Sequence, residues 1–116
     1  MLVHNIIKEL GDEVTAIRRA LHQIPEEGYS EYKTQEYILK YLAGLGLDKV
    51  EKVACTGVKA VFNATNPRRT IAFRADMDAL SIEEKNQHHF VSKNKGLMHA
   101  CGHDGHMAIL LGMASL

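Results

Sequence analysis

The sequence predicts a layered α/β domain, and the order of its hydrophobic patterns carries that prediction. Before Lys49 apolar residues recur at three- and four-residue steps, which is the period of amphipathic helices. After Lys49 the period falls to two, which is typical of half-buried strands. Helices followed by strands, with an apolar helix at the end, indicate helices packed against a sheet.

Two helices are expected first. One spans residues 2–23, where a single apolar face alternates with charged side chains. Pro25 then favours a turn over the segment IPEEGYSE. The second helix spans residues 33–45, with Thr34 as its N-cap and two glycines at its end.

About three strands should follow. Val50 and Val53 begin a short extended piece, and alternation over residues 58–64 predicts a half-buried strand. The run TIAFRA, residues 70–75, is apolar at consecutive positions, as in a central strand covered on both faces. Residues 81–98 show no clean period and are expected to form a long loop. The segment MAILLGMASL then predicts a buried helix.

Composition excludes several classes of protein. The 116 residues suffice for one folded unit, and 46% apolar with 24% charged residues argues against disorder. Fourteen basic and fourteen acidic residues balance, so neither nucleic acid nor a membrane surface is an expected partner. No apolar run has the length of a signal core, and we expect a cytoplasmic protein. Cys55 and Cys101 are expected as free or metal-bound thiols.

The first candidate site is the segment RADMDAL, where the predicted central strand ends. Open α/β sheets place functional groups beyond the carboxyl ends of their strands. Asp76 and Asp78 are two residues apart, so in an extended chain both carboxylates point the same way and together bind a cation or raise one pKa. A turn cap and a solvated carboxylate are the structural alternatives, and for Asp78 the two interpretations are evenly balanced.

The second candidate site is HACGHDGH, residues 99–106. His99, Cys101 and His103 share a two-residue spacing, so their side chains can converge on one metal ion of the zinc type. Asp104 either caps the following helix or fixes a histidine tautomer, and His106 lies on the same side as His103 if the helix has begun. The other histidines are too scattered to place in a site: His4, His22, His88 and His89.

Two other classes of function stay open at this point. Cys101 close to a helix start could be a nucleophile paired with a histidine, although no third group that would orient the histidine is evident. Alternatively, HACGHDGH could be a non-catalytic metal staple that fixes the last helix. The two carboxylates at the end of the predicted strand favour an enzyme over such a structural metal site, because a structural site does not require them.

Four segments carry a resemblance to a known family: RRALHQIPEEGYSEYKTQEYILKYL, TGVKAVF, IAFRADMDAL and GLMHACGHDGHMAILLG. They resemble consecutive motifs of the N-acyl-amino-acid amidohydrolases. These form a branch of the aminoacylase and zinc-carboxypeptidase superfamily that includes hippurate, auxin-conjugate and N-acetyldiaminopimelate hydrolases. The resemblance implies that residues 1–116 are the N-terminal part of a three-layer α/β zinc-peptidase-like catalytic domain.

The resemblance also implies roles for individual residues. Cys101 and His103 match the family's first two metal ligands, in a site that holds two divalent ions, manganese, zinc or nickel. Asp76 matches an active-site aspartate that orients the metal centre, while Asp78 belongs to the motif without a firm role. The remaining donors are expected to support the ligands without touching the metal: His99, Asp104 and His106. The implied reaction is hydrolysis of the amide bond in an N-acyl amino acid.

The sequence departs from the family pattern in what it lacks. The glutamate pair that supplies the proton shuttle, the later histidine ligands and the dimerisation domain all fall after Leu116. We therefore expect the 116 residues alone to be inactive, and the full-length protein to be a homo-oligomer. A smaller departure is Ser81, where the family usually has proline.

Overall fold

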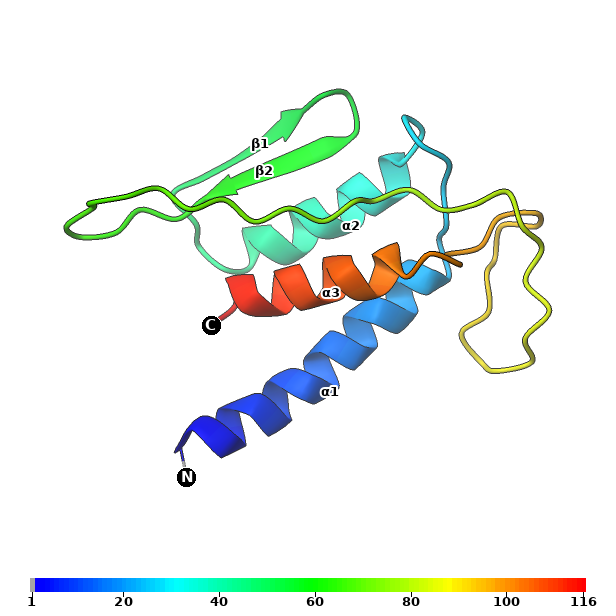
Figure 1. Ribbon diagram of the computed structural model, residues 1–116, viewed down its shortest axis with the longest axis horizontal. Helices are drawn as coiled ribbons and strands as arrows, with labels where there is room; N and C mark the ends of the chain where they lie inside the picture. The colour runs from blue at the N-terminus through cyan, green and yellow to red at the C-terminus, as the bar shows by residue number, and fades with distance from the viewer. Residues whose placement is uncertain (1) are drawn as a thin grey trace.

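The computed structural model describes residues 2–116 and is a mixed α/β arrangement, as the sequence predicts. In Figure 1 the two-stranded hairpin lies over α2, and α3 lies between α2 and α1. The core is formed where the three helices meet and is extended by partly buried side chains of the hairpin. Within the described residues the elements are α1 (Leu2–His22), α2 (Tyr32–Ala43), β1 (Lys49–Val53), β2 (Gly57–Val61) and α3 (His103–Ala114).

Helix α1 packs against α3 with the second half of its apolar face. Ile17 and Leu21 are buried in the core, whereas Leu2 and Val3 are exposed although they continue the same stripe. Contact between the two helices is close at Gly112, where an added Cβ atom would lie 2.4 Å from Val14 Cγ2. The helix pair therefore depends on a residue without a side chain at position 112.

The start of α2 differs from the expected cap. Glu31, not Thr34, occupies the N-cap position, and it makes no capping hydrogen bond through its side chain. Thr34 is buried in the first turn, and both its backbone N–H and its hydroxyl donate to Glu26 Oε1, each at 2.7 Å. Lys33 N–H donates to the other oxygen of Glu26 at 3.0 Å. A carboxylate from the preceding turn thus satisfies the free N–H groups of α2.

Strands β1 and β2 form an antiparallel hairpin with Lys49 opposite Val61 and Val53 opposite Gly57. The alternation in the sequence located both strands, although β2 ends at Val61, before the expected residue 64. The side-chain amide of Gln35 donates to the carbonyls of Cys55 and Gly57, each at 3.1 Å. This contact fixes the hairpin turn against α2.

The prediction of a central strand at residues 70–75 is wrong for the part of the chain that the structure describes. These residues are extended, but they join no sheet and make no backbone hydrogen bond among residues 2–116. Ile71 and Phe73 are 74% and 64% exposed. A run of consecutive apolar residues becomes a central strand only when other strands pair with it on both sides, and the described residues supply none.

The remaining segments follow the predictions in part. Residues 81–98 form an irregular loop, closed at its base by an isolated antiparallel bridge between Leu80 and Met98. Helix α3 buries one face, whereas Ile109 and Met113 on its other side are exposed, so it is not buried all round. Among residues 2–116, none of the helices has the length and apolar character needed to span a membrane.

Candidate metal centre

Three of the predicted site residues meet where α3 begins. His103, the first residue of α3, has its Nδ1 atom 3.0 Å from Asp78 Oδ1 and 2.9 Å from the Asp78 backbone carbonyl. Its Nε2 atom lies 4.0 Å from Asp76 Oδ2. The two carboxylates therefore face the same imidazole, as their two-residue spacing predicts.

The contact with the Asp78 carbonyl determines which ring nitrogen of His103 is available. A carbonyl oxygen only accepts hydrogen bonds, so Nδ1 carries the proton and donates it. In a neutral imidazole Nε2 then keeps its lone pair, which is the form that binds a metal ion. Asp78 thereby fixes both the tautomer and the orientation of the ring.

Asp76 presents one carboxylate oxygen toward that ring and uses the other to bind Arg74. Arg74 donates to Asp76 Oδ1 through Nε at 3.0 Å and through Nη2 at 2.7 Å. These hydrogen bonds hold the pKa of Asp76 below its usual range, with a further contribution from the charge of the guanidinium. The carboxylate is therefore ionised at neutral pH, and Oδ2 faces His103.

His99, Cys101 and His103 do not form the expected three-donor chelate within the described residues. Cys101 is an exposed free thiol, whereas His99 is buried, and neither ring nitrogen of His99 has a hydrogen-bond partner within residues 2–116. Burial lowers the pKa of His99, so its ring is neutral. Gly102 adopts a left-handed conformation with φ +88°, which ends the extended alternation before α3 begins. The two-residue spacing brings the three side chains to one point only if the chain is extended as far as His103.

Asp104 points away from this imidazole, whereas His106 lies on the same side of α3 as His103, as expected once the helix has begun. Asp104 is buried and makes no helix-capping hydrogen bond. Its Oδ2 atom lies 2.7 Å from His22 Nδ1 and accepts a hydrogen bond from Arg18 Nε at 2.9 Å. Asp104 therefore orients a histidine, which is one of the two roles predicted for it. That histidine is His22 of α1. His106 is exposed, with its ring 6.0 Å from that of His103.

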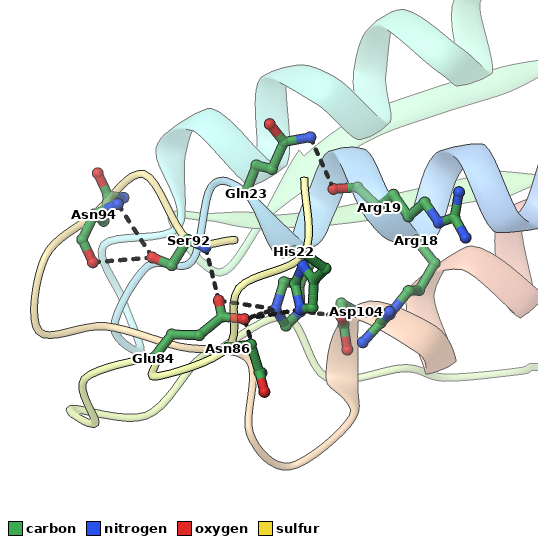
Figure 2. A network of polar contacts seen from close by, with 10 residues as sticks. Arg18, Arg19, His22, Gln23, Glu84, Asn86, Ser92, Asn94 and Asp104 are labelled. Atoms are coloured by element: carbon green, nitrogen blue, oxygen red, sulfur yellow. Dashed lines mark hydrogen bonds and ion pairs between the residues drawn. The ribbon is translucent and has the colours of Figure 1, made fainter. Parts of the chain in front are cut away.

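A second polar cluster, which no sequence pattern predicts, lies around His22 and includes Asp104 of α3. His22 is buried between Asp104 and Glu84, as Figure 2 shows, with Nε2 3.0 Å from Glu84 Oε1. His88 approaches the same carboxylate, with Nε2 3.1 Å from Oε2. These residues come from α1 and from the 81–98 loop, 62 positions apart, so no spacing rule connects them.

The side chains of Cys101, His103 and Asp76 have the chemistry that a divalent metal ion requires, but they do not supply enough donors at one point. An exposed thiol, a histidine nitrogen with a free lone pair and an ionised carboxylate are donors that zinc and its neighbours accept. Within the part of the chain that the structure describes, however, no three donor atoms that include Cys101 or His103 lie within 4.8 Å of one another. The described residues therefore do not bring together three protein ligands around Cys101 or His103.

The sequence matches known proteins over this same region. Residues 72–116, which include Asp76, Cys101 and His103, match the family model described as peptidase family M20/M25/M40. The N-acetyldiaminopimelate deacetylase of Listeria monocytogenes is 52% identical over 103 residues, which cover 88% of this chain and 28% of that protein. The deacetylase of the same name from Anoxybacillus flavithermus is 53% identical over 98 residues, or 26% of its length.

Solved structures agree with the sequence matches. A crystal structure from methicillin-resistant Staphylococcus aureus superposes with a TM-score of 0.89 at 41% identity, covering 98% of this chain and 30% of that one. A Bacillus subtilis protein, described as a dinuclear metal binding peptidase from the M20 family, gives a TM-score of 0.87 at 37% identity, covering 93% and 30%. These matches confirm the family resemblance and the fold, and the chain spans little more than a quarter of the length of its curated relatives.

Proposed function

We propose that the chain forms part of a metal-dependent amide hydrolase of the M20 peptidase family, with Cys101 and His103 as metal ligands. The observation that carries the proposal is the contact of His103 Nδ1 with Asp78, which leaves Nε2, 4.0 Å from Asp76 Oδ2, as the ring nitrogen available to a metal ion. The match of residues 72–116 to the family model supports it. The description of the Bacillus subtilis neighbour as a dinuclear metal binding peptidase supports a metal centre.

Each side chain of the site has a separate task in this proposal. A bound manganese, zinc or nickel ion supplies a Lewis acid that polarises the amide carbonyl and acidifies a water molecule. Asp78 holds the ring of His103 in the tautomer that leaves Nε2 free. Arg74 keeps Asp76 ionised, and Asp76 positions the ligand side of that ring. The expected support roles of His99 and His106 stay predictions, because neither residue contacts His103 through a hydrogen bond within residues 2–116.

The substrate we propose is an N-acyl amino acid, by analogy with the relatives named N-acetyldiaminopimelate deacetylase. Because no three-donor group includes Cys101 or His103, we propose that the 116 residues do not turn over substrate without further donors. A cytoplasmic location and a homo-oligomeric full-length protein complete the proposal.

A chimeric enzyme tests the proposal directly. This chain replaces the matching 103 residues of the Listeria monocytogenes deacetylase, and hydrolysis of N-acetyldiaminopimelate is measured with added manganese. We expect activity in the chimera, and a loss of more than about a hundredfold after Cys101→Ser or His103→Gln. Cys55→Ser is the matched control, because Cys55 is also an exposed free cysteine but lies in the hairpin turn.

Two results would contradict the proposal. One is full activity in the Cys101→Ser chimera, and the other is metal-dependent turnover by the 116-residue chain alone. The cysteine-nucleophile alternative predicts inactivation by thiol alkylation and resistance to chelators. It is less well supported, because no hydrogen bond joins the Cys101 thiol to a histidine within residues 2–116 and His103 Nδ1 is engaged by Asp78.

A further inference from the structure

A second group of side chains of the types that bind metal ions lies outside the proposed hydrolase centre. His22, Glu84 and His88 each offer a ligand atom, and these atoms all lie within 4.8 Å of one another. Among residues 2–116 this is the one group of three histidine, cysteine or carboxylate donors that meets that distance. It contains neither Cys101 nor His103.

The cluster is built from side chains that are already held in place. The Glu84 side chain is only 3% exposed, and the backbone N–H of Ser92 and the amide of Asn86 donate to its two oxygens at 2.7 and 3.0 Å. Burial opposes ionisation, but these hydrogen bonds and His22 outweigh it and lower the pKa of Glu84 to about 2. The carboxylate is therefore anionic at neutral pH.

His22 is oriented by a carboxylate in the way that metal-binding histidines are. Its Nδ1 atom lies 2.7 Å from Asp104 Oδ2, and Asp104 is fixed in turn by Arg18, as Figure 2 shows. A carboxylate on one ring nitrogen directs the other nitrogen toward the metal and makes it a stronger donor. The Nε2 atom of His22 points at Glu84.

His88, the third member of the cluster, is also held in place. Its ring stacks on Phe90, with centroids 3.7 Å apart and planes inclined by 18°, which restricts its orientation. Its Nε2 atom lies 3.1 Å from Glu84 Oε2, while its Nδ1 atom is buried and has no hydrogen-bond partner within the described residues.

We propose that His22 Nε2, Glu84 and His88 Nε2 form a zinc site that ties α1 to the 81–98 loop. Two imidazole nitrogens and one carboxylate form a ligand set that zinc accepts, with water as the fourth ligand. On binding, the ion takes the place of the protons that His22 Nε2 and His88 Nε2 each present to the Glu84 carboxylate. The His22 proton is released to solvent and the His88 proton moves to Nδ1, so that both rings bind as neutral imidazoles. Asp104 then connects this site to the start of α3, one residue from His103.

The experiment uses cobalt as a spectroscopic substitute for zinc. Both proposed ligands of the hydrolase centre are first removed by Cys101→Ser and His103→Gln, which are exposed and half-buried positions outside the cluster. Cobalt is then titrated into this double variant. We expect visible d–d absorption that saturates at about one ion per chain, without the near-ultraviolet band of a thiolate ligand.

Neighbouring histidines give a matched pair of further variants. His88→Gln in the double-variant background should weaken cobalt binding by more than about tenfold, and His89→Gln should leave it unchanged, because His89 is exposed and outside the cluster. Zinc should raise the thermal midpoint of the double variant and of its His89→Gln derivative, but not that of the His88→Gln derivative. Far-ultraviolet circular dichroism is used to check that each variant is folded.

Either of two outcomes would overturn this proposal: no cobalt spectrum in the double variant, or equal affinities for the His88→Gln and His89→Gln derivatives. A hydrogen-bonded imidazolium bridge between Asp104 and Glu84 would then explain the cluster. The result is independent of the proposed hydrolase function, because the double variant lacks that site.

Discussion

Replacing Gly112 by alanine tests the helix packing that positions the start of α3. The new Cβ atom would lie 2.4 Å from Val14 Cγ2, whereas carbon atoms in contact are about 3.5–4.0 Å apart. Val14 belongs to α1, so either the valine or the whole helix must move. The substitution therefore probes the contact between α1 and α3 directly.

The expected magnitude follows from two opposing effects. Overpacking of this kind costs about 1–3 kcal/mol, while glycine to alanine within a helix gains up to about 1 kcal/mol. Gly105, in the same helix, has no atom within 4 Å of an added Cβ, so Gly105→Ala carries the favourable effect alone. The difference in unfolding free energy between the two variants should therefore be about 1–3 kcal/mol, with Gly112→Ala the less stable.

Urea denaturation followed by circular dichroism measures this difference. A double variant, Val14→Ala with Gly112→Ala, should recover part of the loss, because the colliding methyl groups are gone. If Gly112→Ala is as stable as Gly105→Ala, then α1 and α3 are not packed as closely as the structure has them, and the reasoning fails.

Two further predictions concern buried polar groups. The pKa of Glu84 is about 2 in the folded protein against 4.5 in the unfolded chain, so its contribution of up to about 3 kcal/mol is present above pH 4.5 and is lost as the pH falls toward 2. Unfolding free energies measured between these pH values should fall more steeply for the wild-type chain than for Glu84→Gln, and parallel slopes would contradict the assignment. Replacing Thr34 by valine keeps the shape but leaves Glu26 Oε1 without the buried hydroxyl, at a cost of about 1–3 kcal/mol in urea denaturation. Thr15→Val, which removes an exposed hydroxyl that donates to Gly11, should cost less than half as much.

The helices and the hairpin were predictable because their patterns are local. The apolar face that includes Ile17 and Leu21 located α1 to within a residue of its end, and the change of period after Lys49 located the two strands, though not their pairing as a hairpin. The cap of α2 was not predictable in the same way, since Thr34 has the chemistry of a cap but turns inward to Glu26. Capping preferences depend on residue type alone, so they do not predict that the Glu26 carboxylate of the preceding turn accepts these hydrogen bonds.

The site was predictable only where sequence neighbours stay neighbours in space. Asp76 and Asp78 face one imidazole because the chain is extended between them, whereas the left-handed Gly102 separates His103 from the alternation that begins at His99. The identity of the ligands still comes from the family resemblance. The cluster around Glu84 could not be inferred, because it exists only after the 81–98 loop has folded onto α1.

The extended segment TIAFRA has a consequence for handling the chain in solution. Residues 70–75 offer a row of backbone donors and acceptors beside exposed Ile71 and Phe73, with no pairing strand among residues 2–116. Such an edge is a template for strand exchange between copies, and short β-prone stretches of this kind nucleate cross-β aggregates. Pairing of this segment with a second copy of itself should therefore become faster as the concentration of the chain rises.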